Sequence, residues 1–310
     1  MSAAKEEEGT NMMFCEGIML RCAGCGVKED DGIKLKRCTA CYLVRYCSVK
    51  CQKDHRPQHK KACKKRAAEL RDEILFKQPE STHLGDCPIC CLPLPLVLGE
   101  STMYTCCSKS ICDGCAYANT LSNRNDVGKV FSCPFCRTSM EGEDEEENHR
   151  RKMKRIEAND PATMIHVGTT KHYRNGDYKG AFELWTKAAD LGDAEAHYKL
   201  ACLYAKGEGV EKDEKKYVNH SEKAAIGGHP IARHNLAQIE AKHGRLDRAV
   251  KHWTIASNLG YDYSLEVLRE NFRRGLVSEE EFEAALRGNQ AANDATKSWE
   301  REEVKKVFRK

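Results

Sequence analysis

Residues 22–63 read CAGCGVKEDDGIKLKRCTACYLVRYCSVKCQKDHRPQHKKAC, and the spacing of cysteine and histidine in this stretch decides how it folds. Two CxxC pairs are followed by four more ligand-type residues, separated by five, three, seven and three others. The eight are Cys22, Cys25, Cys38, Cys41, Cys47, Cys51, His59 and Cys63. Eight thiolate and imidazole ligands supply two tetrahedral zinc sites. So short a stretch buries too little apolar surface to fold alone, and we expect each zinc to contribute roughly 10–16 kcal/mol to its stability.

A second cysteine-rich block follows at residues 87–136. Its pairs are Cys87-Pro-Ile-Cys90, Cys106-Cys107, Cys112-Asp-Gly-Cys115 and Cys133-Pro-Phe-Cys136. Three CxxC pairs, with a fourth pair between the first and the second, predict two further interleaved zinc sites. We therefore expect four zinc ions, two in each block.

The distribution of cysteine favours metal over disulfides. Of 18 cysteines, 17 lie between Cys15 and Cys136. The first residues are acidic and hold no apolar stretch, so we expect no secretory signal and a location in the reducing cytosol or nucleus. The longest apolar candidate, Leu92–Leu98, is interrupted by two prolines, and we expect no membrane span.

The formal net charge of +4 turns negative once fifteen ligand thiolates and four zinc ions are counted. Twelve Lys and Arg nevertheless lie between Lys34 and Arg66, with Asp54 as the sole acid. This surface either binds nucleic acid or offsets the negative charge of the thiolates. We favour the second interpretation, since no aromatic ladder accompanies the charge, and rank nucleic acid as an unlikely partner.

The second half of the chain repeats itself. Lys187–Gly192 (KAADLG) returns as Lys223–Gly228 (KAAIGG) after 36 residues and as Ile255–Gly260 (IASNLG) after another 32. Within one unit Ala181, Trp185, Ala188 and Ala189 fall on one helical face. A period in the mid-thirties with two helices per unit is typical of an α-solenoid. Asp160-Pro161 predicts a helix start, and Ser278 with Glu281 predicts a capping box.

The first block resembles a MYND-type zinc finger at all eight ligand positions. The resemblance implies one zinc on Cys22, Cys25, Cys47 and Cys51, and the other on Cys38, Cys41, His59 and Cys63. Members of this family dock short proline-containing peptides. They usually carry tryptophan five residues after the sixth ligand, where this chain has Arg56, so peptide docking stays open here.

The second block resembles a RING finger. The resemblance implies one zinc on Cys87, Cys90, Cys112 and Cys115, and another on Cys107, Cys133, Cys136 and a fourth ligand. The usual histidine position holds Lys109, which cannot ligate as an ammonium. We expect Cys106 to replace it, with Cys91 as the alternative.

RING fingers of ubiquitin ligases bind a charged ubiquitin-conjugating enzyme and hold its thioester in a reactive conformation, with no covalent catalytic residue of their own. By resemblance, Ile89 and Pro134 contact the conjugating enzyme, and Arg137 stands where ligases carry a cation that bridges it to ubiquitin. The alternative interpretation of Ile89 and Pro134 is local packing and turn formation. No serine or cysteine nucleophile motif appears in the chain.

Tyr204–Asp213 followed by Lys223–Gly228 resembles the Sel1-like repeat, a relative of the tetratricopeptide repeat, over roughly Asp160 to Tyr261. We thus predict a multidomain chain, with two small zinc-stabilised cross-brace fingers before an all-α solenoid of helix-turn-helix repeats. The predicted divisions are a disordered tail (1–14), MYND-like finger (15–66), linker helix (67–84), RING-like finger (85–140), charged linker (141–157), repeats (158–263) and C-terminal helices (264–310).

These features predict a zinc-dependent adaptor. The repeats and the MYND-like finger hold a client protein, and the RING-like finger brings the conjugating enzyme to it. The alternative is a scaffold without ligase activity, whose fingers only recognise proteins. We assign no function to residues 289–310, which are highly polar.

Overall fold

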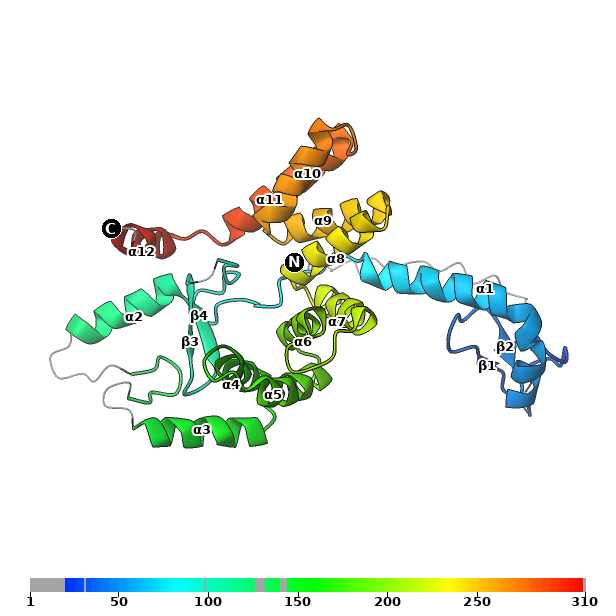
Figure 1. Ribbon diagram of the computed structural model, residues 1–310, viewed down its shortest axis with the longest axis horizontal. Coiled ribbons are helices and arrows are strands. Elements are labelled where there is room, and N and C mark those ends of the chain that lie inside the picture. Colours follow the sequence, from blue (N-terminus) through cyan, green and yellow to red (C-terminus); the bar gives the residue numbers. More distant parts are fainter. Residues whose placement is uncertain (1–19, 31, 98, 126–131, 140–143, 309–310) are drawn as a thin grey trace, which may run out of the picture. The chain divides into compact units, whose positions relative to one another are not determined.

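The computed structural model describes residues 20–30, 32–97, 99–125, 132–139 and 144–308 (Figure 1). The predicted disordered tail, residues 1–14, lies outside these ranges. The chain divides into two compact units, Met1–Ile74 and Leu75–Lys310, which we describe separately. Among the described residues, no helix is both long and apolar enough to cross a membrane.

The first unit contains little apolar core. Strand β1 (Lys36–Arg37) pairs antiparallel with β2 (Arg45–Tyr46), and α1 (Val49–Leu75) follows. The buried cluster consists of Leu35, Tyr46 and three cysteines, with small or half-buried neighbours around them. So small a cluster cannot offset the conformational entropy lost on folding, as the sequence leads us to expect of a metal-stabilised finger.

The second cysteine block opens the second unit. Strands β3 (Ser101–Tyr104) and β4 (Lys109–Cys112) form an antiparallel hairpin with Ser101 opposite Cys112, and α2 (Asp113–Asn125) follows directly. Its buried residues are Leu94, Tyr104 and Ile111 together with cysteines. The hairpin turn carries Cys106 and Cys107, while α2 begins between two other cysteines.

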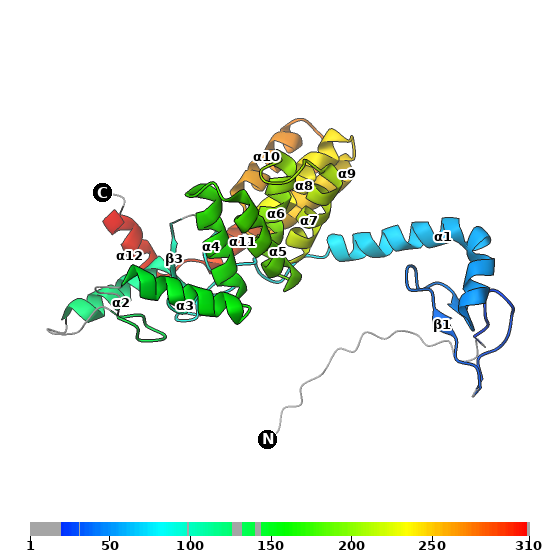
Figure 2. The ribbon, with the colours of Figure 1, turned by 60° about the horizontal axis from the view of Figure 1, so that its bottom comes forward.

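Most of the described residues from Asp144 onward form helices, and Figure 2 shows those of the repeats, α4 to α9, side by side, whereas α12 packs against α2. The helices are α3 (Glu145–Glu157), α4 (Pro161–Tyr173), α5 (Tyr178–Asp190), α6 (Ala194–Lys206), α7 (Glu214–Ile226), α8 (Pro230–Lys242), α9 (Leu246–Asn258), α10 (Asp262–Arg273), α11 (Glu279–Ala295) and α12 (Trp299–Phe308). Consecutive pairs α4–α5, α6–α7 and α8–α9 pack against each other, which confirms the predicted helix-turn-helix repeat.

Local sequence signals set the helix ends. Asp193 accepts a hydrogen bond from the backbone N–H of Ala196 at the start of α6, and Gly207 ends α6 in the left-handed conformation at φ 78°. The predicted helix start at Asp160-Pro161 and the capping box of Ser278 and Glu281 are both present. The predicted inner face, with Trp185 at its centre, is buried against Met164, Leu200 and Leu203.

The segment between α1 and the second cysteine block lies on the solenoid. Leu75 packs with Ala225 and Leu236, and the guanidinium of Arg233 donates to the carbonyl oxygens of Leu75 and Ala225. Further along, the backbone N–H of His83 donates to the carbonyl of Gly228 at 3.1 Å. The segment is thus anchored to the repeats at both ends.

Candidate metal centres

The structure brings all sixteen predicted ligands into four sets of four. The sets are Cys22, Cys25, Cys47 and Cys51; Cys38, Cys41, His59 and Cys63; Cys87, Cys90, Cys112 and Cys115; and Cys106, Cys107, Cys133 and Cys136. Within each set the ligand atoms all lie within 4.8 Å of one another. The division agrees with the interleaved pairing that the resemblances imply.

The distances between sulfur atoms fit zinc. A tetrahedral site with zinc–sulfur bonds of 2.3 Å separates its sulfurs by about 3.8 Å. The Sγ atoms of Cys90 and Cys112 are 3.8 Å apart, and those of Cys107 and Cys133 are 3.6 Å apart. The Nε2 atom of His59 lies 3.2 Å from the Cys41 sulfur. These separations are far longer than a disulfide bond of about 2.05 Å.

The CxxC loops share one backbone turn. The residue after the second cysteine has positive φ and donates its N–H to the carbonyl of the first cysteine. This holds for Gly26, Tyr42, Cys91 and Arg137, with φ between 56° and 77°. This turn places the two thiols of a pair near one point. Four of the five CxxC pairs therefore share one backbone conformation. Cys112–Cys115, by contrast, opens helix α2.

Backbone amides prepare some thiols for ionisation. Burial raises the pKa of the Cys22 thiol, but backbone N–H donors, first that of Cys47, outweigh it and lower the pKa to about 6. The same opposition lowers the pKa of Cys87 to about 6. In contrast, hydrogen bonding to Cys51 raises the pKa of Cys47 to about 12. Thiols of one set cannot all ionise together without a cation, and a zinc ion supplies that positive charge.

The adjacent pair completes the fourth set. Cys106 lies 3.4 Å from Cys136, sulfur to sulfur, and Cys107 pairs with Cys133. Lys109 is exposed in β4 opposite Tyr104 and belongs to no set. Cys91 is exposed and also lies outside the sets. The hairpin turn explains the pairing, because it presents two consecutive residues at one end of the ribbon.

The three residues assigned to partner binding lie beside these centres. Ile89 is 45% exposed although it is a large aliphatic residue, and Arg137 is exposed directly after Cys136. Pro134 is half-buried between Cys133 and Cys136. Ile89 and Arg137 are therefore accessible to a partner.

A fifth set of ligand-type residues contains two histidines and a carboxylate, His83, His229 and Glu195, and no cysteine. The Nε2 atoms of His83 and His229 lie 3.3 and 2.9 Å from the same Glu195 oxygen. His229 Nδ1 accepts the N–H of Ala232, so a neutral His229 carries its proton on Nε2, the atom that a metal would need. Lys199 pairs with the other carboxylate oxygen. This set is an ion-pair and hydrogen-bond cluster that fixes His83 to the solenoid.

One feature escaped the sequence analysis. Arg301 of α12 is 5% exposed, and its guanidinium donates to the Cys90 sulfur at 3.3 Å. The sequence analysis assigned no function to residues 289–310 and did not predict this contact. Arg301 and Val304 are both buried on one face of α12, which only the folded structure reveals. His55, which bonds the Tyr46 hydroxyl, is half-buried yet belongs to no ligand set.

Comparison with known proteins agrees with this geometry. Residues 21–63 match the family model of the MYND finger, and residues 164–193 and 194–229 each match that of the Sel1 repeat. A search of curated proteins found no match.

Similar solved structures include a Sel1 repeat protein from Oxalobacter formigenes, at 25% identity, 49% coverage of this chain, 65% coverage of that chain and a TM-score of 0.42. Another is c5321, a protective antigen of uropathogenic Escherichia coli with an SLR fold, at 20% identity, 63% and 40% coverage and a TM-score of 0.38. A third is MamA, at 18% identity, 53% and 91% coverage and a TM-score of 0.30. The chain covers less than two thirds of the first two structures.

This chain contains a zinc-binding MYND finger followed by Sel1 repeats, an arrangement that supports a role as an adaptor between proteins.

Proposed function

We propose that this adaptor is a RING-type ubiquitin-protein ligase whose four zinc ions are held by the sixteen side chains described above. The observation that carries the proposal is the second cysteine block. Its two sets alternate along the chain, as in a RING finger, and two side chains are exposed beside the ligands: Ile89 between Cys87 and Cys90, and Arg137 directly after Cys136. Bound zinc supplies folding stability to these loops rather than chemistry.

The ligase activity depends on positioning. Ile89, with Pro134, offers an apolar contact to a ubiquitin-conjugating enzyme, and Arg137 supplies hydrogen-bond donors that hold ubiquitin against that enzyme. Restricting the thioester to a reactive conformation lowers the entropic part of the barrier, without a nucleophile from this chain. The Sel1 repeats and the MYND finger hold the client protein whose lysines receive ubiquitin.

An autoubiquitination assay with a panel of conjugating enzymes tests the proposal. Wild type forms chains, while Ile89→Ala and Arg137→Ala lose roughly tenfold or more of the rate, which corresponds to about 1.4 kcal/mol. Matched controls are Val97→Ala, which removes another exposed aliphatic side chain, and Lys109→Ala, which removes another exposed cation. Both controls retain activity, and zinc content is unchanged in all four variants.

If the wild type forms no ubiquitin chains with any conjugating enzyme of the panel, the ligase proposal is wrong. The chain is then a scaffold whose fingers only recognise proteins, because a RING-like fold by itself does not establish catalysis.

A further inference from the structure

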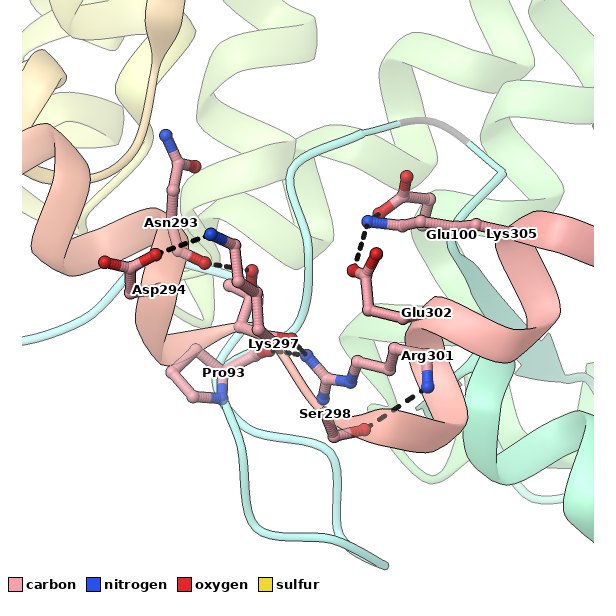
Figure 3. Close-up of polar contacts among 10 residues, drawn as sticks. Pro93, Glu100, Asn293, Asp294, Lys297, Ser298, Arg301, Glu302 and Lys305 are labelled. Atoms are coloured by element: carbon pink, nitrogen blue, oxygen red, sulfur yellow. Dashed lines mark hydrogen bonds and ion pairs between the residues drawn. The ribbon is translucent and has the colours of Figure 1, made fainter.

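The guanidinium of Arg301 is a buried cation. Its two terminal nitrogens carry four N–H groups, and each has a partner: the Nη1 atom donates to the carbonyls of Pro93 and Thr296, and Nη2 to the Leu92 carbonyl and the Cys90 sulfur. Figure 3 shows the Arg301 side chain extending from α12 to the loop of Pro93. Four bonds fix the guanidinium in one position, 211 residues along the chain from Cys90.

This cation has no carboxylate partner among the residues that the structure describes. The three carbonyl oxygens that it contacts are neutral, and its remaining partners are the sulfurs of Cys90 and Cys112. A buried charge is costly unless an opposite charge compensates it. Cys90 belongs to the set with Cys87, Cys112 and Cys115, and four thiolates around one zinc ion carry a net charge of −2. The metal centre is the one source of negative charge that the Arg301 contacts offer.

The backbones of α2 and α12 lie in close contact where Arg301 reaches the ligand cysteines. A Cβ atom added to Gly114, which lies between Cys112 and Cys115, would stand 2.9 Å from the Arg301 backbone nitrogen and 3.0 Å from the carbonyl carbon of Glu300. Helix α12 packs against α2 at this point, and Val304 is buried one turn later. Absence of a side chain at Gly114 therefore permits the close contact of α12 with the ligand loop.

We propose that Arg301 is the counter-ion and hydrogen-bond donor that completes the Cys87–Cys90–Cys112–Cys115 zinc centre, making the C-terminal helix a structural part of the RING-like finger. The N–H···S bond withdraws charge from the Cys90 sulfur and compensates the negative centre. The inference rests on the zinc assignment proposed above but not on ligase activity.

Zinc transfer from the full-length, zinc-loaded protein to the chelator 4-(2-pyridylazo)resorcinol tests this role. Loss of an outer partner of a ligand typically lowers metal affinity by about 10–100-fold, and we expect Arg301→Gln to release one zinc about tenfold faster or more. Alkylation with N-ethylmaleimide during release, followed by peptide mass spectrometry, identifies the set that opens. Cys87, Cys90, Cys112 and Cys115 become labelled first, while the MYND finger cysteines keep their wild-type rate.

Two further variants separate this role from general destabilisation. Gly114→Ala keeps the arginine but pushes α12 away, and we expect the same selective release. Lys306→Gln removes a cation from the same helix that is 71% exposed and paired with Glu303, and it keeps the wild-type release rate. Wild-type release from Arg301→Gln, or equal acceleration at all four sets, overturns the inference. Absence of zinc from this set in the wild type would instead overturn the zinc assignment.

Discussion

At the residue scale, the fingers depend on one strained turn used four times. The residue that follows each of four CxxC pairs adopts positive φ, which costs a non-glycine residue roughly 1–2 kcal/mol. Only Gly26 avoids that cost, while Tyr42, Cys91 and Arg137 bear it. Arg137 thus has a backbone role as well as its proposed contact with ubiquitin. Cys91, which the sequence left as an alternative ligand, has a conformation explained by this turn.

Removing single thiols tests the ligand assignment. We expect Cys106→Ala to bind three zinc ions per chain, because the fourth set then keeps only three ligands. Cys91→Ala is the matched control and binds four. Native mass spectrometry counts the ions. Four ions in Cys106→Ala together with three in Cys91→Ala would show that the ligand roles are reversed.

At the element scale, the solenoid depends on close contact between helices α4 and α5. A Cβ atom on Gly168 would lie 2.6 Å from the Trp185 Nε1 atom and 2.9 Å from Cδ1. Trp185 is 1% exposed and donates to the Ile165 carbonyl, so its ring has little room to move. A glycine inside α4 weakens that helix but lets the largest side chain of the core lie against its backbone.

The variant Gly168→Ala sets the gain in helix propensity of α4 against the overpacking of its new methyl group on Trp185. Helix propensity alone would stabilise the variant by roughly 1 kcal/mol. Overpacking in a dense core typically costs about 1–3 kcal/mol, and the Trp185 ring has little room to yield. We expect net destabilisation of about 1–2 kcal/mol in urea unfolding followed by circular dichroism. Unchanged or increased stability would contradict the contact.

At the scale of the second unit, the segment before the second cysteine block is fixed to the repeats by Glu195. Burial raises the pKa of this carboxyl, but its bonds to His229 and His83 outweigh burial and hold the pKa well below its usual range. The rings of His83 and His229 stack with centroids 4.1 Å apart. Gly228, at φ 81°, leaves room for the carbonyl of Ser81. These contacts join the repeats to the finger within one unit.

Glu195→Gln tests this attachment. The neutral amide of glutamine lacks the negative charge that pairs with His83 and His229. We therefore expect the free energy of unfolding to fall by about 1–3 kcal/mol. Hydrogen exchange measured by mass spectrometry is expected to increase across residues 79–86. Glu211→Gln, at an exposed position in the α6–α7 loop, is the control and leaves exchange there unchanged. Equal exchange in the two variants contradicts the attachment.

The sequence by itself determined the features that local chemistry controls. Ligand spacing predicted two zinc-stabilised fingers, because a CxxC pair and a one-turn spacing place thiols together whatever surrounds them. Repeated KAA-type segments predicted the solenoid, because each unit buries its small residues against its sequence neighbours. The helix start at Asp160 and the capping box at Ser278 were predictable for the same reason, since caps depend on residues only a few positions apart.

Only the tertiary structure decided the contacts between segments distant in the chain. Arg301 lies 211 residues from the Cys90 sulfur, and His83 lies more than a hundred residues from Glu195. Neither pairing produces a periodic pattern in the sequence, because the burial of a charged side chain depends on which distant elements pack against it. The sequence analysis assigned no function to residues 289–310 for this reason, yet folding places the Arg301 guanidinium against the Cys90 sulfur.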